Sequence, residues 1–360
     1  MFRPAPRASG YFRTAYAQDA ALVQTCTEKA SLVLFLVALA VLPFAVGPFL
    51  LDLACQVLLA SIGALSLMLL TGYAGQISLG HAGLIAAGAF TTGILAREIH
   101  APFWLTLPAS ALTGVVLGFI FGLPSLRLRG LYLAVSTLAL HFIVIYLGGE
   151  YETKRGFSTG IVVDPPSLFG VALRDGRAWY FVLLAATAAC LLICINLLRS
   201  RSGRAWLAIH TRETVAEALG IHVARYKLLA FVISSAMTSV AGCLFAYYRG
   251  FVSIEAFDLF LSIQYVAMII IGGMGSLLGA ILGAAFVVVF PYVIEALLHL
   301  LPNVQRLAGD IFAVNYASFG VAMILFLIFE PLGLVGIWHR VQNYFLLWPF
   351  KQRPLAGGRK

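Results

Sequence analysis

"TGYAGQISLGHAGLIAAGAF", residues 71–90, lies inside a run of 44 residues, 53–96, that has no Asp, Glu, Lys or Arg. Such a run can enter a lipid bilayer, since a helix needs about 20 apolar residues to cross the hydrocarbon core. Five of the twenty quoted residues are nevertheless glycine, and each glycine costs a helix interior about 1 kcal/mol relative to alanine. The stretch therefore predicts a membrane segment that is not a plain helical anchor.

The rest of the chain has the same apolar character. The sequence is 61% hydrophobic and only 11% charged, whereas a soluble domain has about 25% charged residues. Eight uncharged runs of at least 19 residues follow one another: 31–51, 53–96, 101–126, 131–149, 178–198, 228–248, 259–294 and 311–329. The sequence therefore predicts an all-α polytopic membrane protein.

Two of these runs are too long for one span. Residues 53–96 hold two spans with a break near Gly72–Gln76, and residues 259–294 hold two short spans with a break near Gly272–Ser276, or one span and a re-entrant piece. The total is about ten transmembrane helices with Gly-rich broken or re-entrant segments.

Positive charge predicts how the chain lies in the membrane. Residues 199–227 hold six Lys/Arg against two Glu, and residues 340–360 hold five and no acid, whereas the loop at 150–177 has four of each sign. Cytoplasmic loops are enriched in Lys and Arg. We therefore expect 199–227 and both termini in the cytoplasm and 150–177 outside. The net charge of +9 then serves orientation and does not indicate nucleic-acid binding.

Three parts follow from this layout. Residues 1–29 form a basic cytoplasmic segment, either an interfacial helix or disordered, residues 30–338 form the transmembrane domain, and residues 339–360 form a basic cytoplasmic tail. The first apolar run is too long for the core of a cleavable signal peptide.

The motifs that are missing narrow the function. The dipeptide Gly-Lys does not occur, so the chain has no P-loop for ATP, and no zincin, nucleophile-elbow or metal-spaced His/Cys motif appears. The clearest ionisable residues inside the spans are His81, His141 and Glu295, which is little for a proton relay. The sequence therefore favours a passive channel or a pathway powered by another subunit. Cys190 and Cys194 are read as lipid- or core-facing apolar residues.

The basic loop at 199–227 predicts a short surface helix. Thr211 is placed to cap it, Glu213 suits the positive end of its dipole, and Arg212–Leu219 consists mostly of helix-forming residues. Gly220 is the residue that a left-handed helix stop requires.

The same segment has a small apolar face. Val215 and Leu219 lie four residues apart, and a short amphipathic helix of this kind can dock into a groove on a partner protein. The alternative is an ordinary loop that is basic only for orientation.

Several stretches in one order resemble a known family. The quoted Gly-rich stretch resembles the motif of the LivM-type permeases, the integral subunits of branched-chain amino acid ABC importers. Further stretches are similar to later parts of that family: "RLRGLYLAVSTLAL" (127–140), "RSGRAWLAIHTRETVAEALGI" (201–221), "KLLAFVISSAMTSVAGCLFAY" (227–247), "SIQYVAMIIIGGMGSLLGAILGAAF" (262–286) and "PLGLVGIW" (331–338). The resemblance covers about residues 30–340.

The resemblance implies an ABC importer in a bacterial inner membrane. Its partners would be two ABC ATPase subunits, a second, LivH-like permease, an extracytoplasmic solute-binding protein and membrane lipid, with no nucleic acid. ATP and Mg would bind the ATPases, so this chain would carry no cofactor or metal and would not be an enzyme. The implied cargo is Leu, Ile or Val, and the alternatives are urea, short amides or aromatic acids, or a secondary carrier or channel.

The resemblance also gives the loop helix a role, that of a coupling helix seated in an ATPase. The implied coupling residues are Arg212, Glu213, Glu217, Ala218, Leu219 and Gly220, of which Glu217, Ala218 and Gly220 match the family element. His210 and Thr211 replace part of the family's usual A-I-R-x-x-E sequence, so the chain departs from the family pattern at these two positions.

Both Gly-rich stretches are candidates for the translocation pathway or its gate, because broken backbone at membrane depth occurs only inside the protein or along a cavity. The candidate residues are Gly72, Gly75, Gln76, Ser78, Gly80 and His81 in the first stretch and Gly272, Gly273 and Gly275 in the second. The alternatives are close helix packing alone and, for His81, a structural role.

The two stretches also share a spacing. Gly72, Gly75 and Gly83 have counterparts exactly 200 residues on, which suits an internal repeat, and the predicted topology places both stretches at the cytoplasmic end of a span.

Overall fold

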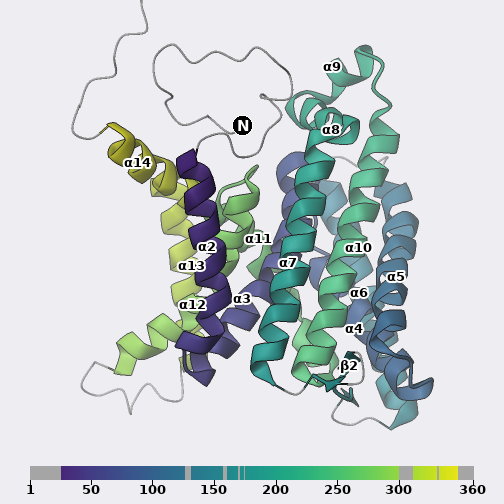
Figure 1. Cartoon of the computed structure of the whole chain (residues 1–360). Coiled ribbons are helices and arrows are strands. Elements are labelled where there is room, and N and C mark those ends of the chain that lie inside the picture. Colours follow the sequence, from purple (N-terminus) through teal and green to yellow (C-terminus); the bar gives the residue numbers. More distant parts are fainter. Residues whose placement is uncertain are drawn as a thin grey trace, which may run out of the picture.

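The computed structural model describes residues 26–125, 131–156, 160–168, 171–173, 175–299, 311–330 and 332–347. It is a bundle of long helices (Figure 1). Of the predicted N-terminal segment 1–29, residues 1–25 lie outside the described residues. Of the predicted tail 339–360, residues 348–360 also lie outside them.

The first half of the bundle contains five long helices and one π-helical turn. In chain order these are α2 (Cys26–Ala45), α3 (Pro48–Leu67), the π-helical turn η1 (Met68–Tyr73), α4 (His81–Glu98), α5 (Phe103–Ser125) and α6 (Leu131–Arg155).

Short strands follow where the sequence predicts the outer loop. Strand β1 (Ile161–Val162) pairs antiparallel with β4 (Phe251–Val252), which follows a later helix. Strands β2 (Ser167–Leu168) and β3 (Val171–Ala172) pair with each other. The β1–β4 pairing therefore ties the 150–177 loop to the chain 90 residues further on.

The second half of the bundle is again helical. Its elements are α7 (Gly176–Arg199), α8 (Arg201–Thr211), α9 (Glu213–Ala218), α10 (Val223–Arg249), the 3₁₀ turn η2 (Ile254–Phe257), α11 (Leu259–Gly272), α12 (Leu277–His299), α13 (Ile311–Phe329) and α14 (Gly333–Leu347).

The all-α polytopic class is confirmed, because each uncharged run corresponds to a helix and the two long runs each correspond to two. In the described part of the chain, seven helices are long and apolar enough to cross a membrane, or eight if α13 and α14, bent by 53°, form one span. The total of ten spans stays a prediction.

The ends of the bundle are arranged as the charge pattern predicts. Helices α8, α9 and α14 lie at one end, and β2 lies at the opposite end (Figure 1). The basic loop and the start of the predicted basic tail, which is part of α14, therefore share an end, and the 150–177 loop is at the other. That the first end faces the cytoplasm stays a prediction from positive charge.

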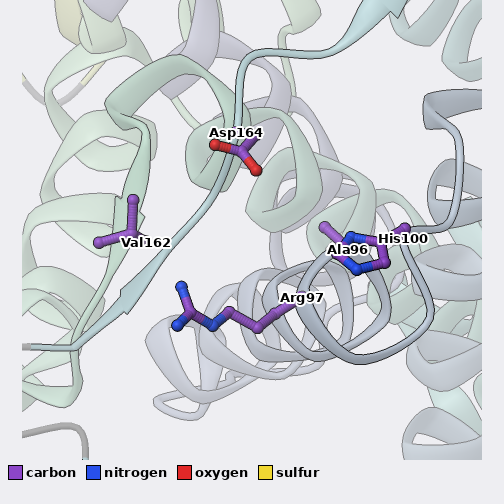
Figure 2. A pocket seen from close by; sticks show the side chains of 5 residues that line it. All are labelled: Ala96, Arg97, His100, Val162 and Asp164. Carbon is purple, nitrogen blue, oxygen red and sulfur yellow. The ribbon is translucent and has the colours of Figure 1, made fainter.

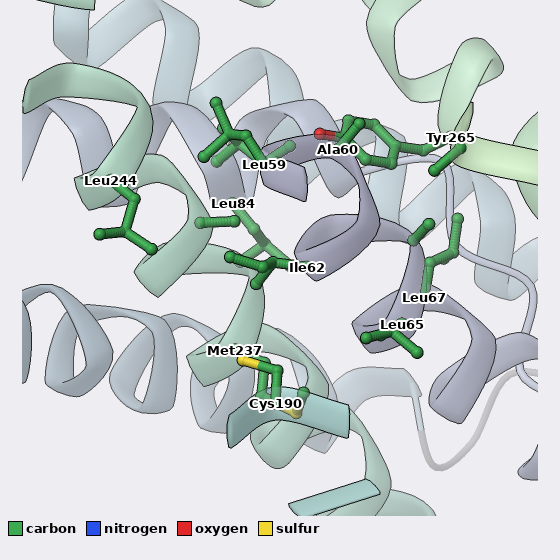
Figure 3. Packing of buried hydrophobic residues seen from close by; sticks show 14 of the residues in the cluster. Leu59, Ala60, Ile62, Leu65, Leu67, Leu84, Cys190, Met237, Leu244 and Tyr265 are labelled. Carbon is green, nitrogen blue, oxygen red and sulfur yellow. The ribbon is translucent and has the colours of Figure 1, made fainter. Parts of the chain in front are cut away.

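Helix α10 packs on α3, α4 and α5. The core that it helps to form includes side chains from α3, α4, α7, α10 and α11, among them Ile62, Leu84 and Met237 (Figure 3). Cys190 and Cys194 of α7 are also buried in this cluster, so they face the core.

Small residues set the distance between the central helices. A β-carbon on Gly88 of α4 would overlap the carbonyl oxygen of Ser239 in α10, and one on Gly242 of α10 would overlap that of Ile85 in α4. Across α5, a β-carbon on Gly114 would lie 2.5 Å from a backbone oxygen of α10. Lipid tails are as apolar as the helices, so close backbone approach is what holds such contacts.

We predict that Gly88→Leu lowers the thermal unfolding midpoint of the detergent-purified chain, because the new side chain forces α4 and α10 apart. Overpacking of this kind costs about 1–3 kcal/mol. The matched control is Gly320→Leu in α13, where a β-carbon has no neighbour within 4 Å. Equal midpoints for the two variants would contradict the packing argument.

Candidate functional site

The first Gly-rich stretch is a break inside the bundle. Helix α3 runs into the wider turn η1, in which the N–H of Ala74 donates to Leu69 O, and Gly75 then adopts a φ of +70°, which only glycine takes easily. Residues 74–80 are not helical, and α4 begins at His81. The break predicted near Gly72–Gln76 is therefore present.

Side chains from η1 and from two other helices, α6 and α11, bond to the backbone of the break and of the first turn of α4. Thr71 Oγ1 donates to Gln76 O at 2.9 Å, and the N–H of Leu79 donates to Thr137 Oγ1 of α6 at 2.9 Å. The N–H of Ala82 in the first turn of α4 donates to Ser262 Oγ of α11 at 2.9 Å. A broken segment at membrane depth needs such partners, because there is no water to replace them.

The polar candidates of the first Gly-rich stretch form other contacts. Gln76 and His81 do donate to backbone carbonyls, but the Ser78 hydroxyl is buried and has no hydrogen-bond partner in the described structure. Thr137 and Ser262 were missed. Both are hydroxyl residues inside uncharged runs of the sequence. Hydroxyl side chains in such runs commonly bond to backbone groups, and this pattern could have identified them.

His81 is held by the bundle. It is fully buried, its Nε2 donates to Gly63 O of α3 at 3.0 Å, and its ring lies 4.9 Å, centroid to centroid, from that of Tyr265. These contacts favour the structural role for His81 over contact with a transported solute.

The second Gly-rich stretch breaks the chain between α11 and α12, as predicted near Gly272–Ser276. Gly273 has a φ of +114° and Gly275 a φ of +81°, and the new helix begins at Leu277. A β-carbon on Gly272 would overlap the carbonyl oxygen of Gly279. The segment therefore turns sharply and packs on its own next helix.

The two breaks face each other. A β-carbon on Gly72 would lie 3.0 Å from the backbone nitrogen of Gly275, and that N–H points at the sulfur of Met68 at 3.3 Å. The shared spacing therefore belongs to two segments that touch. The internal repeat, and the role of either segment in a pathway, stay predictions.

The basic loop folds as two helices above the first break. The predicted helix Arg212–Leu219 is α9, Glu213–Ala218, and Gly220 ends it with a φ of +84°, as predicted. Thr211 is not its cap, and that prediction was wrong: Thr211 is the last residue of α8, its hydroxyl donates back to Leu207 O, and Arg212 occupies the N-cap position with no side-chain bond.

Helix α9 has one buried side and one open side. Ala216 is 1% exposed, whereas Val215 is 48% and Leu219 76% exposed. Glu217, Ala218 and Gly220 are exposed as well. The apolar pair that the sequence predicted therefore faces away from the bundle.

Helix α8 was not predicted separately. Trp206 and Ile209 are buried, and Trp206 Nε1 donates to Tyr226 O at 2.8 Å. The spacing of Ala205, Trp206 and Ile209 places all three on one side of a helix, and this pattern could have predicted α8.

The loop and the first break touch at two neighbouring residues. A β-carbon on Gly75 would lie 2.8 Å from Nδ1 of His210 in α8. Gln76 Nε2 donates to Lys227 O in the first turns of α10 at 2.9 Å, and Lys227 Nζ pairs with Glu213 of α9 at 2.9 Å. Both loop helices are therefore connected to Gly75–Gln76.

A cavity of about 290 Å³ lies at the end of the bundle opposite α8 and α9. Its walls are the C-terminal end of α4 and the chain around β1, and it is lined by Ala96, Arg97, His100, Val162 and Asp164 (Figure 2). It is open and bears one cationic and one anionic side chain.

The described residues contain no group of three His, Cys, Asp or Glu side chains that could hold a metal ion.

Comparisons with known proteins agree on one family. The model of the permease component of branched-chain amino acid transport systems matches residues 49–329. The LivM permease protein of the high-affinity branched-chain amino acid transport system of Salmonella typhimurium is 33% identical over 336 residues, 86% of this chain and 76% of that protein. Its Escherichia coli K12 counterpart is 34% identical, covering 84% and 74%.

More distant relatives carry another name. The autoinducer 2 import system permease protein LsrC of an Enterobacter species is 28% identical over 195 residues, 50% of this chain and 54% of that protein. No solved structure matches the chain.

We predict that Thr137→Val destabilises the chain by about 1–3 kcal/mol, the cost of leaving a buried donor, here the N–H of Leu79, without an acceptor. Thr187→Val in α7 is the matched control, because the Thr187 hydroxyl only donates to backbone carbonyls. Its loss should be about 0.6 kcal/mol, as for other hydrogen bonds between membrane helices. Denaturant unfolding in detergent measures both, and equal losses would exclude the role given to Thr137.

Proposed function

Because the chain belongs to the family of permease components of branched-chain amino acid transport systems, we propose that it forms one half of the membrane pathway of an ABC importer for Leu, Ile or Val. The proposed cargo follows the names of the two LivM relatives, which are 33% and 34% identical to the chain over the aligned residues. The LsrC relatives are named for the import of a different solute, so the fold alone does not select the cargo, and urea, short amides and aromatic acids are the alternatives that transport assays must test.

Helix α9 is the proposed docking element for an ABC ATPase, and its shape is the observation that carries the proposal. It projects from the end of the bundle (Figure 1), with Ala216 buried against the protein and Val215 and Leu219 turned outward. A short helix with an exposed apolar side fits a groove on a partner. The positive charge of residues 199–227 supports placing this helix in the cytoplasm, where ATP is present.

The other subunits follow from the same proposal. Two ATPases would bind and hydrolyse ATP, since the sequence has no P-loop. A second, LivH-like permease would complete the pathway in the inner membrane, and an extracytoplasmic solute-binding protein would dock over the end that carries the 150–177 loop and the cavity at Arg97 and Asp164.

The chain would act by alternating access. ATP binding draws the two ATPases together, and a helix seated in each ATPase moves with it. The permease shifts between inward- and outward-facing states because the ATPases bind the two states with different free energies. No bond is made or broken on this chain.

Two other classes of transport protein, a secondary carrier and a passive channel, would need different features of this chain. A secondary carrier would couple through His81 or Glu295, but Nε2 of His81 donates to Gly63 O inside the bundle and Glu295 is exposed near the end of α12. Transport by a carrier would also stop with an uncoupler while ATP is maintained. A passive channel would work without α9.

The experiment that tests the class is a mild-detergent pull-down of the tagged chain from its native cells. We expect P-loop ATPases and a second, similar permease to co-purify. A single stable species without partners would overturn the proposal and leave a carrier or a channel.

We also predict that Glu217→Arg and Gly220→Trp abolish uptake and the co-purification of the ATPase, while the chain still inserts into the membrane at normal levels. The matched control is Gly156→Trp. Gly156 has a φ of +71°, like the +84° of Gly220, and neither has a neighbour within 4 Å of a β-carbon. Gly156→Trp introduces the same backbone strain as Gly220→Trp but at the opposite end of the bundle, so the ATPase should stay bound. Unimpaired uptake by both loop variants would contradict the docking role of α9.

A further inference from the structure

We propose that Gly75–Gln76 is the joint through which movement of α9 reaches the broken helices, and that Gln76 and Lys227 are positioning residues for the coupling of ATP hydrolysis to transport. This inference rests on the proposed function. It identifies which contacts inside this chain carry the movement.

The first connection runs from the surface helix to α10. Glu213 is the first residue of α9, and its carboxylate lies 2.9 Å from Nζ of Lys227. The side chain of Lys227 is 13% exposed and that of Glu213 27%, so water and salt screen the pair less than a fully exposed one. Moving α9 therefore pulls on the beginning of α10.

The second connection runs from the same lysine to the break. The backbone carbonyl of Lys227 accepts a hydrogen bond from Gln76 Nε2 at 2.9 Å, and Gln76 is 2% exposed. Thr71 holds the carbonyl of Gln76 at 2.9 Å. The amide of Gln76 thus joins the non-helical segment to the residue that α9 holds.

A parallel connection passes through α8. This helix continues directly into α9 and is anchored to α10 by Trp206, and its His210 packs on the backbone of Gly75. Both connections from the loop therefore end at adjacent residues of the break.

The first break is in direct contact with the second, so a movement at Gly75–Gln76 can reach both. Gly72 packs against Gly275 of the second break. Non-helical residues between packed helices take up changes in φ and ψ more readily than a helix interior does, which is the usual property of a hinge. Contact alone does not prove coupling, so the joint needs a test that separates transmission from stability.

The test uses the complete importer in proteoliposomes, with radiolabelled L-leucine and the binding protein, and measures leucine transported per ATP hydrolysed. In Gln76→Leu we expect normal assembly and an ATPase rate within about twofold of wild type, with the transport ratio lower by about tenfold, within the usual range of coupling energies. The matched control is Gln56→Leu in α3, the helix before the break, where the amide bonds only to Asp52 in the described structure. Its ratio should not change.

A second pair of variants tests the same route without altering the break. Lys227→Met removes the ion pair with Glu213 but leaves the backbone carbonyl for Gln76, and Lys227→Arg keeps the charge. We expect the ratio to fall in the first and to recover in the second. The double variant Gln76→Leu/Lys227→Met should be no worse than the poorer single one, because both interrupt one connection.

A conformational measurement covers the case in which Gln76→Leu does not assemble. Ile77 is 46% exposed, and Cys55, Cys190, Cys194 and Cys243 are buried. In a Cys26→Ser background, the thiol of Ile77→Cys should change its labelling rate when the complex is trapped with ATP and vanadate. Adding Lys227→Met should abolish that change.

The outcomes separate the two proposals. A wild-type complex without ATP-driven leucine uptake overturns the proposed function, and this inference with it. A working wild type in which Lys227→Met and Gln76→Leu keep the normal ratio, or lose ATPase activity and transport in equal proportion, overturns the joint alone.

Discussion

The structure depends on one requirement, that a chain which leaves its helix inside a membrane protein must find partners for its freed backbone groups. Here the N–H of Leu79 bonds to Thr137 of α6, the N–H of Ala82 in the first turn of α4 bonds to Ser262 of α11, and the side chain of Gln76 bonds to Lys227 O of α10. Each bond requires its helix to lie beside the break. The break between α3 and α4 therefore requires α6, α10 and α11 to pack around it.

Glycine serves two separate purposes in this arrangement. At Gly88 and Gly242 the missing side chain lets α4 and α10 approach until a β-carbon would meet the opposite backbone, and this is a matter of packing. At Gly75 and Gly273 the positive φ lets the chain turn. The first kind holds two helices close together, whereas the second lets the chain change direction, and Gly75 does so directly against His210 of α8.

The two ends of the bundle divide the tasks of an importer subunit. One end presents α9 with the apolar side chains of Val215 and Leu219 exposed, the feature on which the proposed docking of an ATPase rests. The other end presents short strands and an open cavity with charges of both signs.

The sequence by itself determined the membrane class, the positions of both breaks and the stop at Gly220, because these depend on local properties: absence of charge, length, and the freedom of glycine at positive φ. It misplaced the cap at Thr211, because α8 continues through that residue and turns its hydroxyl back on Leu207. Only the tertiary structure decided that Gln76 bonds to Lys227 and that Gly72 meets Gly275. Such partners lie 151 residues apart or more, and which residues meet over that separation depends on how the helices cross, which no local pattern encodes.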